Sequence, residues 1–169
     1  MGRVRWSALC RLLCQGYAVA VAVNRRYMPF EPASIFGVLR DGTSYARWVV
    51  GTREIRSVDD DWPAAGARLH YRIGWGPAKK DDETKVVRLQ DGTELELEAV
   101  GRPLGSARVD FRVDAVRDGS LVTIIEHPLS GPLRTYHNPA FELLVFLRNV
   151  ETLRRLEREV RRTRHLETG

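Results

Sequence analysis

The chain has 169 residues, of which 43% are apolar, and a net charge of +5. This length is typical of one domain, and the apolar fraction suffices for a core that needs no disulfide bonds. Residues 1–17 carry three arginines and no acid, and residues 148–169 carry seven arginines against four glutamates, so the body between them is close to neutral. A nucleic-acid-binding domain concentrates basic side chains on its folded body, so no nucleic-acid partner is expected.

The N-terminal stretch contains the only two cysteines, Cys10 and Cys14. No histidine or further cysteine lies close enough in sequence to complete a metal site with them, so we expect reduced thiols, no metal and a cytoplasmic location. Arg11 and Gln15 interrupt the apolar run, which argues against a signal peptide. The run is also far shorter than the roughly 20 apolar residues of a membrane-spanning helix. No stable membrane insertion is expected, and the oligomeric state stays open.

The elements can be predicted in chain order from periodicity and turn signals. A first strand is predicted over residues 18–27, where valines alternate with alanines, and two short helices over residues 32–39 and 44–48. Beyond them the apolar period changes to two, which predicts six strands, over residues 53–58, 67–74, 79–89, 94–101, 107–117 and 121–128. The short connections, rich in Asp, Gly and Pro, imply an antiparallel meander.

Strict alternation in these strands distinguishes two faces of the sheet. In residues 94–98 the leucines point one way and the glutamates the other, and Arg108 and Arg112 are expected to pair with those glutamates. His70 and His127 fall on the same outward face. The predicted inward face is apolar and consists of Leu69, Tyr71, Ile73, Leu95, Leu97, Val109, Phe111, Val113, Val122 and Ile124. Such one-sided burial is typical of an antiparallel sheet covered by a helix.

A long C-terminal helix provides that cover. Asn138 is a suitable N-cap and Pro139 a suitable first helical residue. Apolar side chains follow at helical spacing to Val160, on nearly all sides at first and on one side later. The first half of this helix is therefore predicted to be buried and the second half to expose a polar face. The fold class is α+β.

The order of these elements resembles that of the SRPBCC superfamily, which includes START domains, the birch-pollen allergen and polyketide cyclase/dehydrase-like proteins. The resemblance rests on the order and spacing of residues 32–39 with the following Asp41, Tyr45 and Trp48, residues 61–69, Ser130-Gly131-Pro132, and Asn149-Val150-Glu151 with Leu153. It implies a helix-grip fold, in which a curved antiparallel sheet of about seven strands wraps around the C-terminal helix and leaves a hydrophobic cavity. It also implies a START-like ligand-binding domain over residues 18–164, an N-terminal arm over 1–17 and a tail over 165–169. It implies no activity, because one fold hosts many functions.

The residues expected at this cavity define the candidate site. The chain has no metalloprotease, nucleophile-elbow, phosphate-loop or dinucleotide motif, so no cofactor is expected. Glu126 continues the inward row of its strand, and Glu126 and Tyr71 are the candidate acid/base residues; the alternatives are a Glu126 that faces solvent and a Tyr71 that only packs in the core. The predicted ligand-binding residues are Trp48, Leu69, Tyr71, Ile73, Leu97, Val109, Phe111, Ile124, Tyr136, His137, Phe141 and Leu144, with core packing as the alternative for Trp48.

Three functions are compatible with this pattern. The favoured one is binding of a hydrophobic or aromatic small molecule, lipid or polyketide-like, which requires only shape and a few polar anchors. The second is a polyketide cyclase or dehydratase that uses the two acid/base candidates. The third is a protein-interaction module that acts through the arginine-rich end of the long helix.

Overall fold

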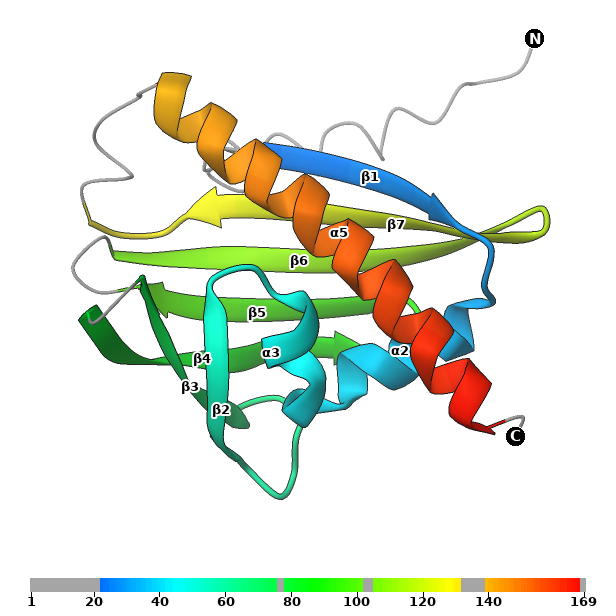
Figure 1. The fold of residues 1–169 in the computed structure, drawn as a ribbon, viewed down its shortest axis with the longest axis horizontal. Helices are drawn as coiled ribbons and strands as arrows, with labels where there is room; N and C mark the ends of the chain where they lie inside the picture. The colour runs from blue at the N-terminus through cyan, green and yellow to red at the C-terminus, as the bar shows by residue number, and fades with distance from the viewer. Residues whose placement is uncertain (1–21, 76–77, 102–104, 132–138, 168–169) are drawn as a thin grey trace, which may run out of the picture.

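The computed structural model describes residues 22–75, 78–101, 105–131 and 139–167. Seven antiparallel strands form one sheet in the order β1-β7-β6-β5-β4-β3-β2 (Figure 1). Every strand after β2 pairs with its predecessor in sequence, as the short turns predict, and β1 pairs with β7 at the edge of the sheet opposite β2. The strands are β1 (Ala22–Met28), β2 (Thr52–Val58), β3 (Arg68–Trp75), β4 (Ala78–Gln90), β5 (Glu94–Gly101), β6 (Gly105–Val116) and β7 (Gly119–Pro128).

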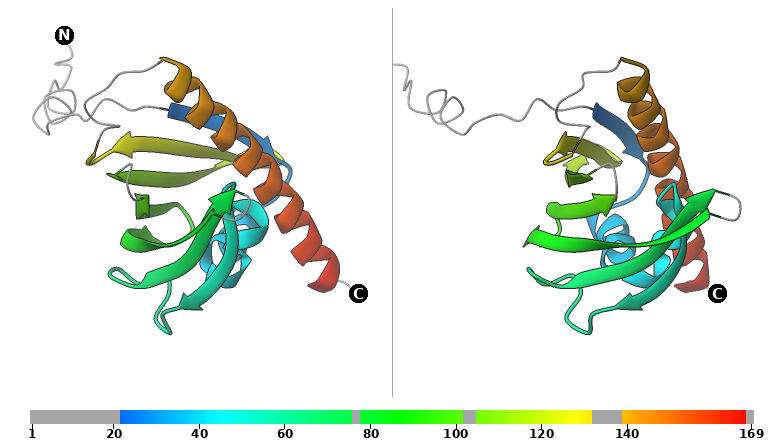
Figure 2. Two further views of the ribbon diagram at one scale, coloured as in Figure 1. Left: turned by 60° about the vertical axis from the view of Figure 1, so that its left-hand side comes forward. Right: turned by 90° about the vertical axis from the view of Figure 1, so that its left-hand side faces the viewer.

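The helices lie on one side of this sheet. Helix α2 (Pro32–Arg40) begins at Pro32, and Asp41 then caps a short 3-10 turn, η1 (Gly42–Ser44), by accepting a hydrogen bond from the Thr43 amide. Helix α3 (Tyr45–Trp48) follows directly, and helix α5 (Pro139–Glu167) is the last element. Figures 1 and 2 show a strongly curved sheet, with α5 running across its concave side and α2 and α3 below it. The predicted helix-grip arrangement is therefore present.

The two faces of the sheet are those that the alternation predicts. Leu95, Leu97 and Phe111 are buried on the concave face. On the convex face Arg108 pairs with Glu96 at 2.9 Å and Arg112 with Glu94 at 3.7 Å. The first strand follows a less obvious pattern, because Val23 is exposed on the outside whereas Asn24 is buried on the inside. Its side chain donates to the Phe146 carbonyl of α5 at 3.2 Å.

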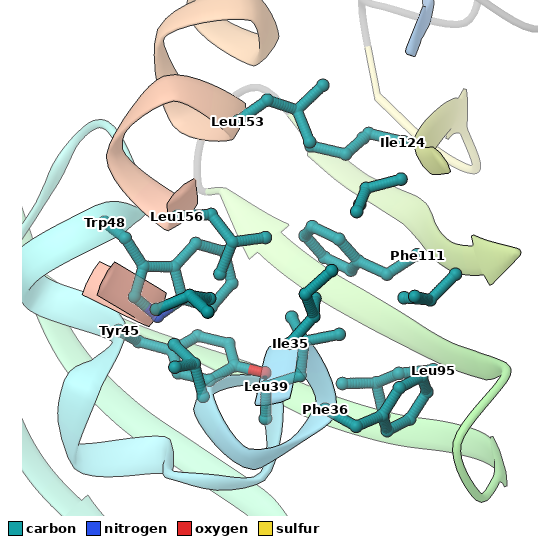
Figure 3. Close-up of a cluster of buried hydrophobic side chains, with 14 of the residues drawn as sticks. Ile35, Phe36, Leu39, Tyr45, Trp48, Leu95, Phe111, Ile124, Leu153 and Leu156 are labelled. Atoms are coloured by element: carbon teal, nitrogen blue, oxygen red, sulfur yellow. Dashed lines mark hydrogen bonds between the residues drawn. The ribbon is translucent and has the colours of Figure 1, made fainter. Parts of the chain in front are cut away.

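The hydrophobic core lies where α2, α3 and the second half of α5 meet the sheet. Leu153 of α5 points toward Ile124 of the sheet, and Leu156 lies beside Trp48 (Figure 3). Trp48 is fully buried, packs edge-on against Phe111 with ring centroids 5.7 Å apart, and donates its indole N–H to Ser44. This cluster holds the C-terminal half of the long helix in place.

The prediction that the first half of α5 is buried is wrong for most of its apolar side chains. Its apolar side chains are largely exposed: Leu143 by 57%, Leu144 by 62%, Phe146 by 43% and Leu147 by 54%. The reason is geometric, because a helix that is apolar on all sides can turn only one stripe toward a sheet. Among the described residues, that stripe lies over a cavity rather than over packed side chains, and Val145 is the buried member of this stretch.

Several predictions concern residues outside the described part. The N-terminal arm with Cys10 and Cys14, the first residues of the predicted first strand, and the N-cap Asn138 all lie there. At the other end α5 continues to Glu167. Within the described residues, no helix combines the length and apolarity needed to cross a membrane.

Candidate ligand-binding cavity

A cavity of about 400 Å³ lies between the concave face of the sheet and the first half of α5. The inward rows of β3, β5, β6 and β7 form its floor, and Phe141, Leu144 and Val145 of α5 cover it. The turn from α3 to β2 closes one side, where the Val50 amide donates to the Thr152 hydroxyl of α5 at 3.4 Å. The cavity exists because the sheet curves away from the helix before their side chains can interdigitate.

Nearly all the described residues that were predicted at the cavity line it. They are Leu69, Tyr71, Ile73, Leu97, Val109, Phe111, Ile124, Phe141 and Leu144, together with Glu126. Trp48 is the exception, since it packs in the core beside the cavity, which is the alternative considered for it. Tyr136 and His137 lie outside the described residues. The alternation in the strands thus locates the cavity wall, while contact of these residues with a ligand stays a prediction.

Glu126 faces the cavity rather than bulk solvent, and only 8% of the residue is exposed. Arg148 Nη2 donates to its Oε2 at 2.5 Å, and Asn149 Nδ2 donates to the same oxygen at 3.2 Å. Asn149 Oδ1 in turn accepts from Nε of Arg148 at 3.3 Å and from Nη2 at 3.1 Å. Three side chains from β7 and α5 therefore form one hydrogen-bonded polar cluster in a mainly apolar wall. A charge-assisted pair of this kind satisfies groups whose burial would otherwise be costly.

A second polar group lies on β3 and β4. The Thr84 hydroxyl donates to the Tyr71 oxygen at 3.3 Å, and Asp82 lies opposite Tyr71 in the strand register. Burial raises the pKa of the Tyr71 hydroxyl, and the hydrogen bond with Thr84 opposes this rise. Tyr71 is therefore protonated at neutral pH and can donate a hydrogen bond into the cavity, whereas it is a poor base there.

Four polar residues that contact or lie opposite Glu126 and Tyr71 were not predicted from the sequence: Asp82, Thr84, Arg148 and Asn149. Asp82 and Thr84 could have been assigned to the cavity by counting back in steps of two from Val86, but the register of β4 was obscured by an irregularity between Val86 and Arg88. Arg148 and Asn149 follow Phe141 by seven and eight residues, the spacing of one helical face. This spacing places them on the cavity side, although it does not reveal that Glu126 lies opposite.

Comparisons with known proteins agree on the architecture. No protein-family model matches the chain, and no curated protein matches it significantly. Solved structures do match. Protein NE0264 from Nitrosomonas europaea is 13% identical with a TM-score of 0.65, and the alignment covers 84% of this chain and 94% of that one. Ara h 8.0201 is 14% identical with a TM-score of 0.63, over 82% and 95% of the two chains.

The Zhui aromatase/cyclase from Streptomyces sp. R1128 is 10% identical with a TM-score of 0.62, over 83% of this chain and 93% of that one. The neighbours are Bet v 1-like, SRPBCC-type structures. The chain has the helix-grip fold. At these identities the likeness shows the fold alone, and one fold hosts many functions.

Proposed function

We propose that this helix-grip domain binds a hydrophobic or aromatic small molecule in the cavity between its sheet and α5. The observation that carries the proposal is a cavity of about 400 Å³ with a mainly apolar wall and two small polar groups. This volume lies within the usual range for small-molecule sites, which combine an apolar lining with a few polar anchors. A ligand there would remove apolar surface of the floor and of Leu144 from water.

Binding can be tested with the neutral dye Nile red, whose fluorescence increases in an apolar site. We expect saturable binding and a rise in melting temperature with dye concentration, because a ligand that binds only the folded state stabilises it. The matched variants are Ala99→Phe, which fills the cavity from β5, and Ala33→Phe on the exposed side of α2. Ala99→Phe should abolish saturable binding and Ala33→Phe should preserve it. Equal binding by both variants would contradict the proposal.

Catalysis of a cyclase or dehydratase type is a second candidate, since the cavity holds a buried carboxylate and a buried phenol. The acid/base roles of Glu126 and Tyr71 stay predictions. Glu126→Gln keeps the shape of the side chain and removes its proton-transfer capacity, so it should bind Nile red like the parent. Turnover of a poly-β-carbonyl substrate mimic by the parent, lost in Glu126→Gln, would support catalysis, and no turnover by the parent would leave binding as the function.

A further inference from the structure

The cluster of Glu126, Arg148 and Asn149 is more specific than a general hydrophobic site requires. An apolar ligand needs no charged side chain, yet the cavity wall carries a guanidinium held by two partners on one side. The Nε and Nη2 atoms of Arg148 donate to Glu126 and Asn149, whereas Nη1 takes part in no hydrogen bond with the described residues. A rigid, planar guanidinium with one remaining nitrogen is suited to donate to a ligand oxygen in a fixed direction.

The charge of Arg148 is already matched before a ligand arrives. Glu126 Oε2 lies 2.5 Å from Nη2 of Arg148, and the side chain of Glu126 is 10% exposed. A ligand carboxylate at Nη1 would come close to the carboxylate of Glu126 and would lose its hydration without gaining an unmatched positive charge. A neutral oxygen acceptor avoids this repulsion and still receives a charge-assisted hydrogen bond.

The apolar part of such a ligand has a defined place beside this cluster. Val109 pairs with Glu126 across the β6–β7 ladder and with Leu97 across the β5–β6 ladder, and all three residues line the cavity. Ile124 precedes Glu126 by two residues on the same face of β7. A ring or chain that lies over Val109 and Ile124 therefore places its polar end next to Arg148.

We propose that the ligand is an uncharged, largely apolar molecule with a carbonyl or hydroxyl oxygen that accepts a hydrogen bond from Arg148 Nη1. The inference rests on the proposed binding function and adds the chemical class of the ligand. It assigns to Glu126 the role of setting specificity, because its charge makes the site select neutral oxygen over a carboxylate.

Three naphthalene probes of similar size separate the contributions: 2-ethylnaphthalene, which has no polar group, 2-acetylnaphthalene, which has a ketone, and 2-naphthoate, which is ionised at pH 7.5. Dissociation constants are measured by Nile red displacement on the parent, Arg148→Met and Glu126→Gln. The control is Arg155→Met, which removes an arginine of the same helix that pairs with Glu151 away from the cavity. Because Arg148→Met leaves Glu126 buried without its counter-charge, the double variant with Glu126→Gln carries the same test if the single variant does not fold.

We expect the parent to bind the ketone more tightly than the naphthoate. Arg148→Met should weaken binding of the ketone about tenfold, which is the contribution of one charge-assisted hydrogen bond. The same variant should leave the dissociation constant of 2-ethylnaphthalene unchanged. Glu126→Gln should strengthen binding of 2-naphthoate about tenfold. Arg155→Met should leave the dissociation constants of all three probes unchanged. Tighter binding of 2-naphthoate than of the ketone by the parent, or equal losses of ketone and hydrocarbon in Arg148→Met, would overturn this inference while leaving the binding function intact. If the parent binds none of the three probes, the proposed function itself fails.

Discussion

The N-terminal half of α5 is much more apolar than the C-terminal half, yet the C-terminal half is the one whose apolar side chains are buried in the core. In the C-terminal half, Leu153, Leu156 and Val160 are at most 1% exposed and pack against the sheet and the short helices. The same half also forms two ion pairs with the rest of the domain, Arg26 with Glu157 and Arg47 with Glu159, each at 2.6 Å. In the N-terminal half, four large apolar side chains are exposed and the inward side chains cover a cavity.

This difference shows that apolarity and burial are separate properties of a helix. The C-terminal half is amphipathic, so its apolar stripe coincides with the surface it meets. The N-terminal half carries apolar side chains on nearly all sides. Polar contacts attach it to the sheet, among them Asn24 with the Phe146 carbonyl and Arg148 with Glu126. The C-terminal half anchors the helix, while the N-terminal half forms the cover of the proposed ligand site.

The largest expected change in stability concerns the C-terminal half of α5, which anchors the helix. Leu156 is fully buried, so Leu156→Ala should lower the free energy of unfolding by about 2–5 kcal/mol through lost burial and the cavity left behind. Urea denaturation measures the change. A loss below about 1 kcal/mol would mean that the C-terminal half is not the anchor.

The ion pairs of Glu159 in the same half should contribute less to the free energy of unfolding than Leu156 does, and their contribution should depend on pH. The hydrogen bond from Arg162 lowers the pKa of Glu159, and Arg47 acts in the same direction against the opposing effect of burial. A lowered pKa in the folded state stabilises the fold above the ordinary glutamate pKa, and this contribution disappears as pH falls through the lowered value. Glu159→Gln should therefore cost about 1.5 kcal/mol at pH 7 and progressively less in acid.

The control for this pH dependence is Glu151→Gln on the same helix. Glu151 pairs with Arg155 and Arg158, but its side chain is 35% exposed, so solvent screens the pairs and the loss should be smaller. Denaturation curves between pH 3 and pH 7 measure both variants. A cost of Glu159→Gln that does not change with pH would contradict the assignment.

The N-terminal half of α5 should open locally more easily than the C-terminal half, and its local stability should depend on the hydrogen bond of Asn24. Asn24→Ala removes the donor to the Phe146 carbonyl and should cost about 1 kcal/mol. Hydrogen exchange should then accelerate in residues 143–150 and stay unchanged in residues 153–160, because opening is local. Equal acceleration along the whole helix would show that the two halves open as one unit.

The smallest expected effect concerns the outside of the cover. Leu143 and Leu147 are 57% and 54% exposed, so the double variant Leu143→Lys with Leu147→Lys should change the free energy of unfolding by no more than about 0.5 kcal/mol. A loss comparable to that of Leu156→Ala would mean that another part of the chain buries these leucines.

Local sequence signals were sufficient to predict the elements and the faces of the sheet. Alternation in β5 and β6 distinguishes the apolar from the charged face, and the turn residues specify antiparallel neighbours. Most of the apolar cavity wall followed from that alternation. These features depend on a residue and its near neighbours in sequence, so the sequence determined them by itself.

Only the tertiary structure decided how distant segments meet. Arg148 and Glu126 are 22 residues apart, and Asn24 and Phe146 are 122 apart, so no local period could pair them. The exposure of Leu143 and the space beneath Phe141 depend on how far the sheet curves away from α5. Periodicity predicts which side chains share a face, but the distance between two faces is set by the packing of the whole chain, and that distance decides between a solid core and a cavity.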